Sequence, residues 1–232
     1  RTPRISLAGF HKAWKEAKNR GEVDVPREYV LFFETATPGV IIVNTSRIQG
    51  LDATNPFHLS RAEQIGRHQC LQIFNFLKRY CPGFENAIRM DASSQIGVRE
   101  SRHVKGLYTL IADDLAASRK FSDPVALGGY PVDIHSPDKA QTDSVHFGKG
   151  ATYQIPMRSL LVNNPRNLVI AGRCISATHE AMAAFRVTPI AMAIGQAAGT
   201  IAALSVNNNV AASQVEYREI REQLLMNGAK LP

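Results

Sequence analysis

The sequence has few of the residues that build disulfide frameworks or metal sites. Its 232 residues include three cysteines, none in a C-x-x-C pair, and seven histidines without H-x-x-x-H spacing. Disulfides and a zinc site are therefore not expected, and we predict no metal site. Thiols in this pattern are typical of the cytoplasm, which we expect to be the compartment.

Charge of one sign is not concentrated anywhere in the chain. The net charge is +7, but no run of five like charges occurs, and no aromatics alternate with arginines. These absences argue against nucleic-acid binding. The opening RTPRISLAGF has neither Met nor an apolar signal core, so we expect the natural N-terminus to lie upstream.

What is present is the composition of an ordinary globular protein. Apolar residues make up 44% and charged residues 20%. A chain of this length can bury one good core, so we expect one compact unit.

The first third predicts two helices around a hairpin. Apolar residues at three- and four-residue spacing predict a helix over Ser6–Asn19. Two β-rich runs, 29–35 and 40–46, are joined by a Pro-Gly turn and predict a hairpin. A capping box of Ser60 and Glu63 predicts the start of a second helix, which should end near Cys81.

The middle of the chain alternates between strand and helix patterns. Strands are expected at 102–109, 130–135 and 153–161, and a short helix at 112–119. This alternation predicts a mixed α/β protein of the α+β class, with a mixed sheet and packed helices. The polar stretch 136–151 is expected to be an exposed loop, or alternatively a mobile lid.

The last third begins with the apolar run Asn167–Gly172, which predicts a strand buried on both faces. The uncharged stretch Thr188–Val206 then predicts a long helix. Gly195 and Gly199 would suit a membrane dimer face, but alanine-rich packing on a sheet fits better, and no membrane span is expected. A final amphipathic helix is predicted from Ser213.

The start of that long helix is a candidate binding site. A helix N-terminus without acidic residues directs backbone N–H groups at an anionic or electron-rich ligand atom. Here the expected donors are Thr188, Ile190 and Ala191, just after Arg186.

Several ordered motifs resemble one bacterial family of FAD-dependent oxidoreductases, related to the glutathione-reductase-like flavoproteins. The motifs are PREYVLFF (26–33), VNTSRIQGLDATNP (43–56), IGVRESR (96–102), GGYPVDIH (128–135), YQIPMRSL (153–160) and NLVIAGRCISATHEAMAAFRVTPIAMAIGQAAGTIAAL (167–204). The resemblance extends over nearly the whole chain.

The resemblance implies a set of cofactor-binding residues. Gly172 and Arg173 would lie beside FAD, and the stretch Arg186, Val187 and Thr188 would face the flavin. Positive potential there stabilises the reduced, anionic flavin. Arg173 departs from the wider superfamily, in which many members have Asp after this glycine, so Arg173 is expected to pair with a phosphate instead.

The resemblance also implies that His179 lies near the flavin edge. This placement makes His179, which is followed by Glu180, a candidate proton acceptor as well as a cofactor contact.

The sequence contains no G-x-G-x-x-G string, which a dinucleotide fold needs for its pyrophosphate. The resemblance therefore implies a C-terminal portion whose partner is the N-terminal FAD-binding half of the same protein. We predict a substrate-domain-like region over 1–160, a returning FAD-domain strand and helix over 161–206, and a C-terminal helix over 207–232.

Candidate substrate-binding residues precede the apolar run. Of Arg99 and Arg102, one is predicted to clamp a substrate carboxylate with two hydrogen bonds while the other supports the flavin. The alternative is a surface network in which both pair with Glu100.

Asp133 and His135 alternate on one face of a predicted strand and could form an oriented base. A half-buried, hydrogen-bonded histidine is the alternative.

Three further residues carry weaker expectations. Cys174 is expected to be a packing residue, and Tyr153 and Arg158 either line the cleft or pack.

The predicted function is hydride transfer between a small organic substrate and N5 of FAD. One alternative is a stably folded but inactive fragment without FAD, and another is a noncatalytic anion-binding module. The substrate and the oligomeric state do not follow from the sequence.

Overall fold

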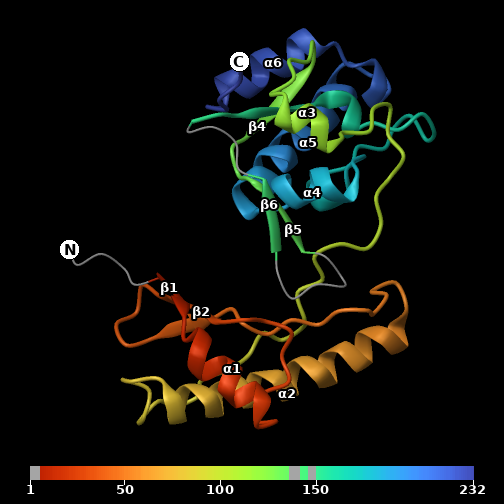
Figure 1. Cartoon of the computed structure of the whole chain (residues 1–232). Coiled ribbons are helices and arrows are strands. Elements are labelled where there is room, and N and C mark those ends of the chain that lie inside the picture. The colour runs from red at the N-terminus through yellow and green to blue at the C-terminus, as the bar shows by residue number, and fades with distance from the viewer. Residues whose placement is uncertain (1–5, 136–141, 146–149) are drawn as a thin grey trace. The chain divides into compact units, whose positions relative to one another are not determined.

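The computed structural model describes residues 6–135, 142–145 and 150–232 (Figure 1). Helices combine with small antiparallel sheets, which confirms the α+β class. The chain forms two compact units in place of the one expected: unit 1 is built on residues up to Val98, and unit 2 on the rest of the described chain from Arg99. The reason is that each unit buries its own hydrophobic core. The predicted boundaries at 160 and 206 concern a complete flavoprotein and stay predictions.

Unit 1 is a three-stranded antiparallel sheet with two helices. Its elements are β1 (Ser6–Gly9), α1 (His11–Asn19), β2 (Val30–Glu34), β3 (Ile41–Val43) and α2 (Pro56–Tyr80). The strand order is β1-β2-β3, so the predicted hairpin is confirmed as β2 and β3. Its core lies between α1, α2 and one face of the sheet, where Trp14 meets Phe76 edge to face.

The first predicted helix begins later than expected. Residues Ser6–Gly9 pair with β2 instead, which places the side chain of Leu7 against the core. Phe10 then adopts a left-handed conformation (φ 63°) that turns the chain into α1. The apolar spacing that predicted one helix is therefore divided between a strand and a helix, which are joined by a sharp turn.

The second predicted helix begins earlier than expected. Asn55 caps α2 by accepting a hydrogen bond from the N–H of Phe57, and Pro56 occupies the first turn. Ser60 donates to the carbonyl of Pro56, while Glu63 accepts from the N–H of Ile96. The predicted capping box therefore does not form, although the helix ends at Cys81 as expected.

Unit 2 is built around two strand pairs and three longer stretches of helix. Its elements are α3 (Ala112–Ala116), β4 (Pro124–Gly128), β5 (Val132–His135), β6 (Thr142–Val145), β7 (Tyr153–Pro156), α4 (His179–Phe185), α5 (Thr188–Asn207) and α6 (Tyr217–Met226). Short 3₁₀ turns include η2 (Gly172–Cys174). β4 pairs with β7, and β5 pairs with β6. The core lies where α5 and α6 pack against β4, and it also includes residues of β7 and α4.

Three predicted segments of unit 2 are wrong. The stretch 102–109 is irregular and makes isolated backbone hydrogen bonds instead of a ladder. The run 167–172 forms one antiparallel bridge, between Leu161 and Val169, because the partner chain is already turning into a 3₁₀ helix just before it. The predicted loop 136–151 contains β6; its remaining residues 136–141 and 146–149 lie outside the described ones.

The long apolar helix is confirmed as α5, but its glycines do not promote close packing. A Cβ added to Gly195 or Gly199 would meet no described atom within 4 Å. The face that packs on the core carries isoleucines and alanines instead, among them Ile194 and Ile201. By length and composition alone α5 could also cross a membrane, and one third of its apolar window is buried.

The last predicted helix is present but shorter. It begins at Tyr217, after a 3₁₀ turn that includes Ser213, so the predicted capping box with Glu216 does not form. Gly228 ends it in a left-handed conformation (φ 80°), as expected.

Candidate active site

Two segments that are distant in sequence lie side by side in unit 2 and carry the candidate site. Val104 donates to the carbonyl of Cys174 (3.1 Å), Leu110 donates to that of Ser176 (3.0 Å), and Thr178 donates to that of Leu110 (2.9 Å). These bonds fasten the irregular segment 99–110 along residues 174–178, directly before α4.

Gly106 allows this close approach. A Cβ at this position would lie 2.8 Å from the Cβ of Ser176 and 2.9 Å from the carbonyl oxygen of Leu161. The backbone at the site is therefore packed as tightly as a core.

Glu100 is the centre of the site because its carboxylate contacts two histidines. Its Oε1 lies 2.8 Å from Nε2 of His103, and its Oε2 is hydrogen-bonded to Nδ1 of His179. The Glu100 and His103 side chains are only 23% and 17% exposed, whereas His179 is 46% exposed. A carboxylate held between two imidazoles is an arrangement that can direct protons.

His103 is held from its other side as well. Its Nδ1 lies 3.0 Å from the carbonyl oxygen of Ile175, and Ile175 is completely buried. The ring is thus fixed between a side-chain acceptor and a backbone acceptor.

The predicted cofactor-binding residues are gathered at the entry to α4 and α5. Gly172 and Arg173 form the η2 turn, which packs beside α5. Gly172 has φ +73° and open space where a Cβ would stand, and Arg173 is exposed. Thr188, the first residue of α5, is exposed, and Arg186 and Val187 are half-buried just before it.

One expectation about the α5 terminus is wrong. The N–H groups of Ile190 and Ala191 both donate to the carbonyl of Val187, so they are not available to a ligand. The first turn contains no acidic residue, as expected, and the residues aimed outward are Thr188 and Pro189.

The predicted substrate-binding residues are only partly brought together. Arg99 and Arg102 are both exposed on the segment that carries Glu100. The carbonyl oxygen of Arg99 accepts a hydrogen bond from Nη1 of Arg173 (3.3 Å), which joins this segment to the η2 turn. Both oxygens of Glu100 contact histidines, and the alternative Arg-Glu-Arg network stays a prediction.

His135 and Asp133 belong to β5, which lies beside α4, but their side chains lie outside the described part of the structure.

Other candidate residues have clearer positions. Cys174 is exposed, with its Sγ 3.4 Å from the carbonyl of Ala171, so the expected packing role is wrong. Tyr153 is buried in the core, and that burial raises its pKa. Arg158 forms a two-point ion pair with Asp123. Tyr153 and Arg158 are thus packing residues of unit 2.

The carboxylate of Glu180, the neighbour of His179, accepts hydrogen bonds from groups close to it in the sequence. A hydrogen bond from its own backbone N–H and one from the Thr178 hydroxyl lower the pKa of Glu180. It therefore adds negative charge at the start of α4, where a helix N-terminus favours it.

The sequence analysis missed His103. Its available signal was the three-residue spacing from Glu100, which commonly brings two side chains together in a turn. The spacing alone did not reveal that a carbonyl 72 residues away would hold the other ring nitrogen.

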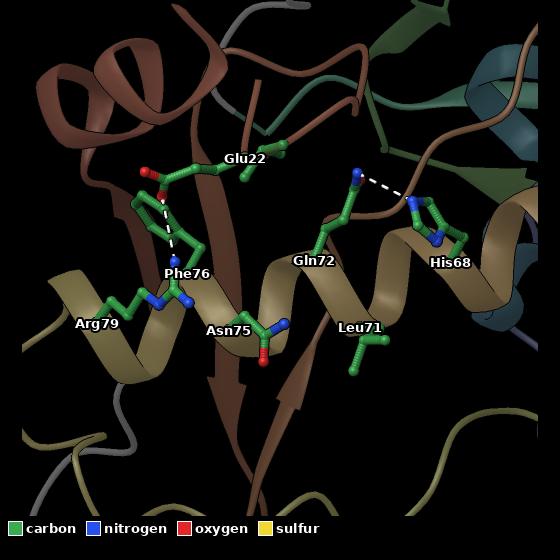
Figure 2. Close-up of a pocket in the computed structure, with 8 residues that line it drawn as sticks. Glu22, His68, Leu71, Gln72, Asn75, Phe76 and Arg79 are labelled. Atoms are coloured by element: carbon green, nitrogen blue, oxygen red, sulfur yellow. Dashed lines mark hydrogen bonds and ion pairs between the residues drawn. The ribbon is translucent and has the colours of Figure 1, made fainter. Parts of the chain in front are cut away.

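A shallow pocket of about 170 Å³ lies apart from these residues, on the α2 surface of unit 1 (Figure 2). Its polar side chains contact one another: His68 with Gln72 (3.2 Å), and Glu22 with Arg79 (3.9 Å). The pocket includes none of the predicted site residues, so it does not enter the functional argument.

Residues 5–224 match the family model described as FAD dependent oxidoreductase. No curated protein and no solved structure matches the chain.

Proposed function

Because the chain belongs to the family of FAD-dependent oxidoreductases, we propose that it takes part in hydride transfer between a small organic substrate and N5 of FAD. The observation that carries this proposal is the family match over nearly the whole chain. The turn at Gly172 and the start of α5, which lie together in unit 2, supply a place for one end of the cofactor.

The residues of this chain fit such a cofactor end. FAD, when bound, supplies the hydride acceptor. The open space over Gly172 lets a flat ring approach the backbone, and the acid-free first turn at Thr188 suits an electron-rich edge. Arg173 and Arg186 add positive charge near this place, which favours negative charge on the ligand.

Arg99 and Arg102 are proposed to bind a carboxylate of the substrate. Both guanidinium groups belong to the segment that is fastened beside the η2 turn, and exposed arginines bind carboxylates in a two-point geometry. His135 stays a proposed contributor to the same site.

We also propose that the N-terminal FAD-binding half of the same protein completes the site. The chain has no G-x-G-x-x-G string for the pyrophosphate. The exposed side of α5, with Met192, Gly199 and Val206, is the apolar surface that this partner would cover. A cytoplasmic protein without a membrane span is consistent with the thiols and with the core packing of α5.

The test is the flavin content of the full-length protein. We expect a visible flavin absorbance spectrum after purification, and a lower flavin content in Thr188→Glu, which places a negative charge beside the proposed ring. Arg218→Glu, an exposed change on α6, is the control and should keep the flavin. A full-length protein that has no flavin and binds no added FAD overturns the proposal.

The absence of a pyrophosphate motif also favours a second candidate, a stably folded chain that binds no FAD by itself. Titration of FAD with the 232-residue chain distinguishes the two. Unchanged flavin fluorescence supports the inactive fragment, and quenching that is lost in Thr188→Glu supports binding by this chain.

A further inference from the structure

The hydrogen-bond partners of His103 determine where the protons of its ring lie. Nδ1 of His103 faces the carbonyl oxygen of Ile175, which can only accept, so this nitrogen carries a proton. Its Nε2 faces Oε1 of Glu100, a second acceptor. Because two lone pairs would repel each other at 2.8 Å, one proton lies between Nε2 of His103 and Oε1 of Glu100.

This pairing determines what happens at His179. The proton between His103 and Oε1 leaves Oε2 of Glu100 an acceptor, and Oε2 faces Nδ1 of His179. The proton of a neutral His179 ring must then reside on Nδ1, which leaves the lone pair on Nε2. Among the described residues no hydrogen bond engages this Nε2, and the ring is nearly half exposed.

The same short stretch carries the proposed cofactor contacts. In the sequence, Arg173 precedes Ile175 and His179 follows it. Arg173 also donates a hydrogen bond to the carbonyl of Arg99, the residue before Glu100. A base fixed at this position would be next to the η2 turn, within unit 2.

We propose that Glu100 holds His179 as its Nδ1–H tautomer, so that Nε2 of His179 is the proton acceptor of the reaction and His103 is the residue that positions Glu100. The role in the reaction rests on the proposed function, whereas the tautomer does not. FAD, when bound, would accept the hydride that leaves the substrate carbon with the electron pair of the C–H bond. The proton of the adjacent O–H or N–H passes to Nε2, and the double bond forms between the two atoms.

The tautomer can be measured on the 232-residue chain by ¹⁵N NMR of the imidazole rings, above about pH 8, where an ordinary imidazole is neutral. We expect His179 to be protonated at Nδ1. His58 provides an internal reference of the opposite kind, since its Nδ1 accepts from the backbone N–H of Asp52 (3.0 Å).

Variants test whether Glu100 is the cause of the Nδ1–H tautomer of His179. Glu100→Ala should move His179 from mostly Nδ1–H to mostly Nε2–H, which is the preferred tautomer of free histidine in water. Glu100→Gln is the second variant, of equal size: its amide NH2 can donate to Nε2 of His103 while its carbonyl still accepts from Nδ1 of His179, so the Nδ1–H tautomer should persist. Glu180→Ala is the matched control: it removes the neighbouring carboxylate, which binds Thr178 and its own backbone, and should leave His179 unchanged.

The positioning role of His103 has its own readout. His103→Gln should give a mixture of both His179 tautomers while the backbone amide spectrum of unit 2 is retained, whereas a purely structural role would leave the tautomer unchanged.

Accessibility of Nε2 is tested with diethyl pyrocarbonate, which acylates unprotonated imidazole nitrogens. Mass mapping should show faster modification of His179 than of His103, because both nitrogens of His103 are engaged. Equal or slower modification of His179 overturns the proposal.

Two further results overturn the proposal: His179 protonated at Nε2 in the wild-type chain, or an unchanged tautomer in a folded Glu100→Ala variant. These measurements need no flavin. A full-length protein without flavin would overturn the proposed function and leave the tautomer result standing.

Discussion

Asp114 shows how a single buried carboxylate organises its surroundings. Its side chain is 3% exposed, and it accepts hydrogen bonds from the hydroxyl of Tyr108 (2.6 Å) and from Arg119 (2.9 Å). Arg119 in turn lies over the rings of Tyr108 and Phe121. Burial alone would favour the neutral acid, but these hydrogen bonds outweigh it and lower the pKa of Asp114.

We expect Asp114→Asn to lower the free energy of unfolding by about 2 kcal/mol at neutral pH, because charge-assisted hydrogen bonds are lost. Since the folded pKa is lowered, the contribution of the carboxylate is complete above its unfolded pKa, about 3.9. It is lost as the pH falls through the folded pKa.

Urea unfolding at neutral pH and below about pH 4 tests this dependence. The gap between wild type and variant should shrink in acid. Asp113→Asn, at the exposed neighbouring position, is the control and should show little change at either pH. A gap that is constant with pH would contradict the prediction.

Gly106 carries a second prediction at the residue scale. Gly106→Ala places a methyl group 2.8–3.2 Å from Ser176, Leu161 and Arg158, of which two contacts are backbone carbonyl oxygens. We expect a loss of more than about 2 kcal/mol in the free energy of unfolding. Gly97→Ala, where no described atom lies within 4 Å, is the control. Equal melting temperatures for the two variants would refute the close approach.

At the scale of elements, sequence patterns predicted helices better than strands. The α5 helix follows from its uncharged composition and Pro189, and α2 ends where Cys81, Pro82 and Gly83 break it. Local chemistry therefore determined where these helices are.

Strands depended on partners that the sequence does not reveal. β1 was assigned to a helix because its apolar spacing fits both structures, and the pairing with β2 decided between them. The run 167–172 forms a single β-bridge and no strand with a ladder of hydrogen bonds.

The candidate site was predictable in the same limited way. Gly172, Arg173 and His179 were proposed from the family resemblance alone, and their place beside a cofactor stays a prediction. The link from Glu100 to His103 and His179 depends on tertiary contacts, and no local pattern contains them.

Helix α5 leads to a prediction at the element scale. Glycine in a helix costs about 1 kcal/mol relative to alanine, and a Cβ at Gly199 meets open space. Gly199→Ala should therefore raise the melting temperature of the 232-residue chain. Ile201→Ala, on the buried face of the same helix, should lower it.

The larger variant Gly199→Leu tests the proposed partner surface. If the N-terminal half covers this face, the full-length protein should lose flavin or stability, while the 232-residue chain tolerates the change. Equal tolerance in both proteins would contradict the proposed surface.

At the scale of the whole molecule, the chain has two hydrophobic cores that share no residue. The single tryptophan, Trp14, is buried in the core of unit 1. Its fluorescence therefore reports on unit 1, while far-ultraviolet circular dichroism reports on both units.

We expect these two signals to give different unfolding midpoints in urea, since separate cores need not unfold together. Phe185→Ala, in the core of unit 2, should shift the dichroism transition and leave the tryptophan transition in place. Coincident transitions in both proteins would show that the chain unfolds as one cooperative unit.

The contact between Glu100 and His179 joins residues 79 positions apart. Closing so long a loop is entropically costly, and contacts of this kind form after local structure is in place. Both residues belong to unit 2, so this contact forms within the fold of that unit. A molecule in which only unit 1 is unfolded would therefore keep this contact, whereas one in which unit 2 is unfolded would lack it.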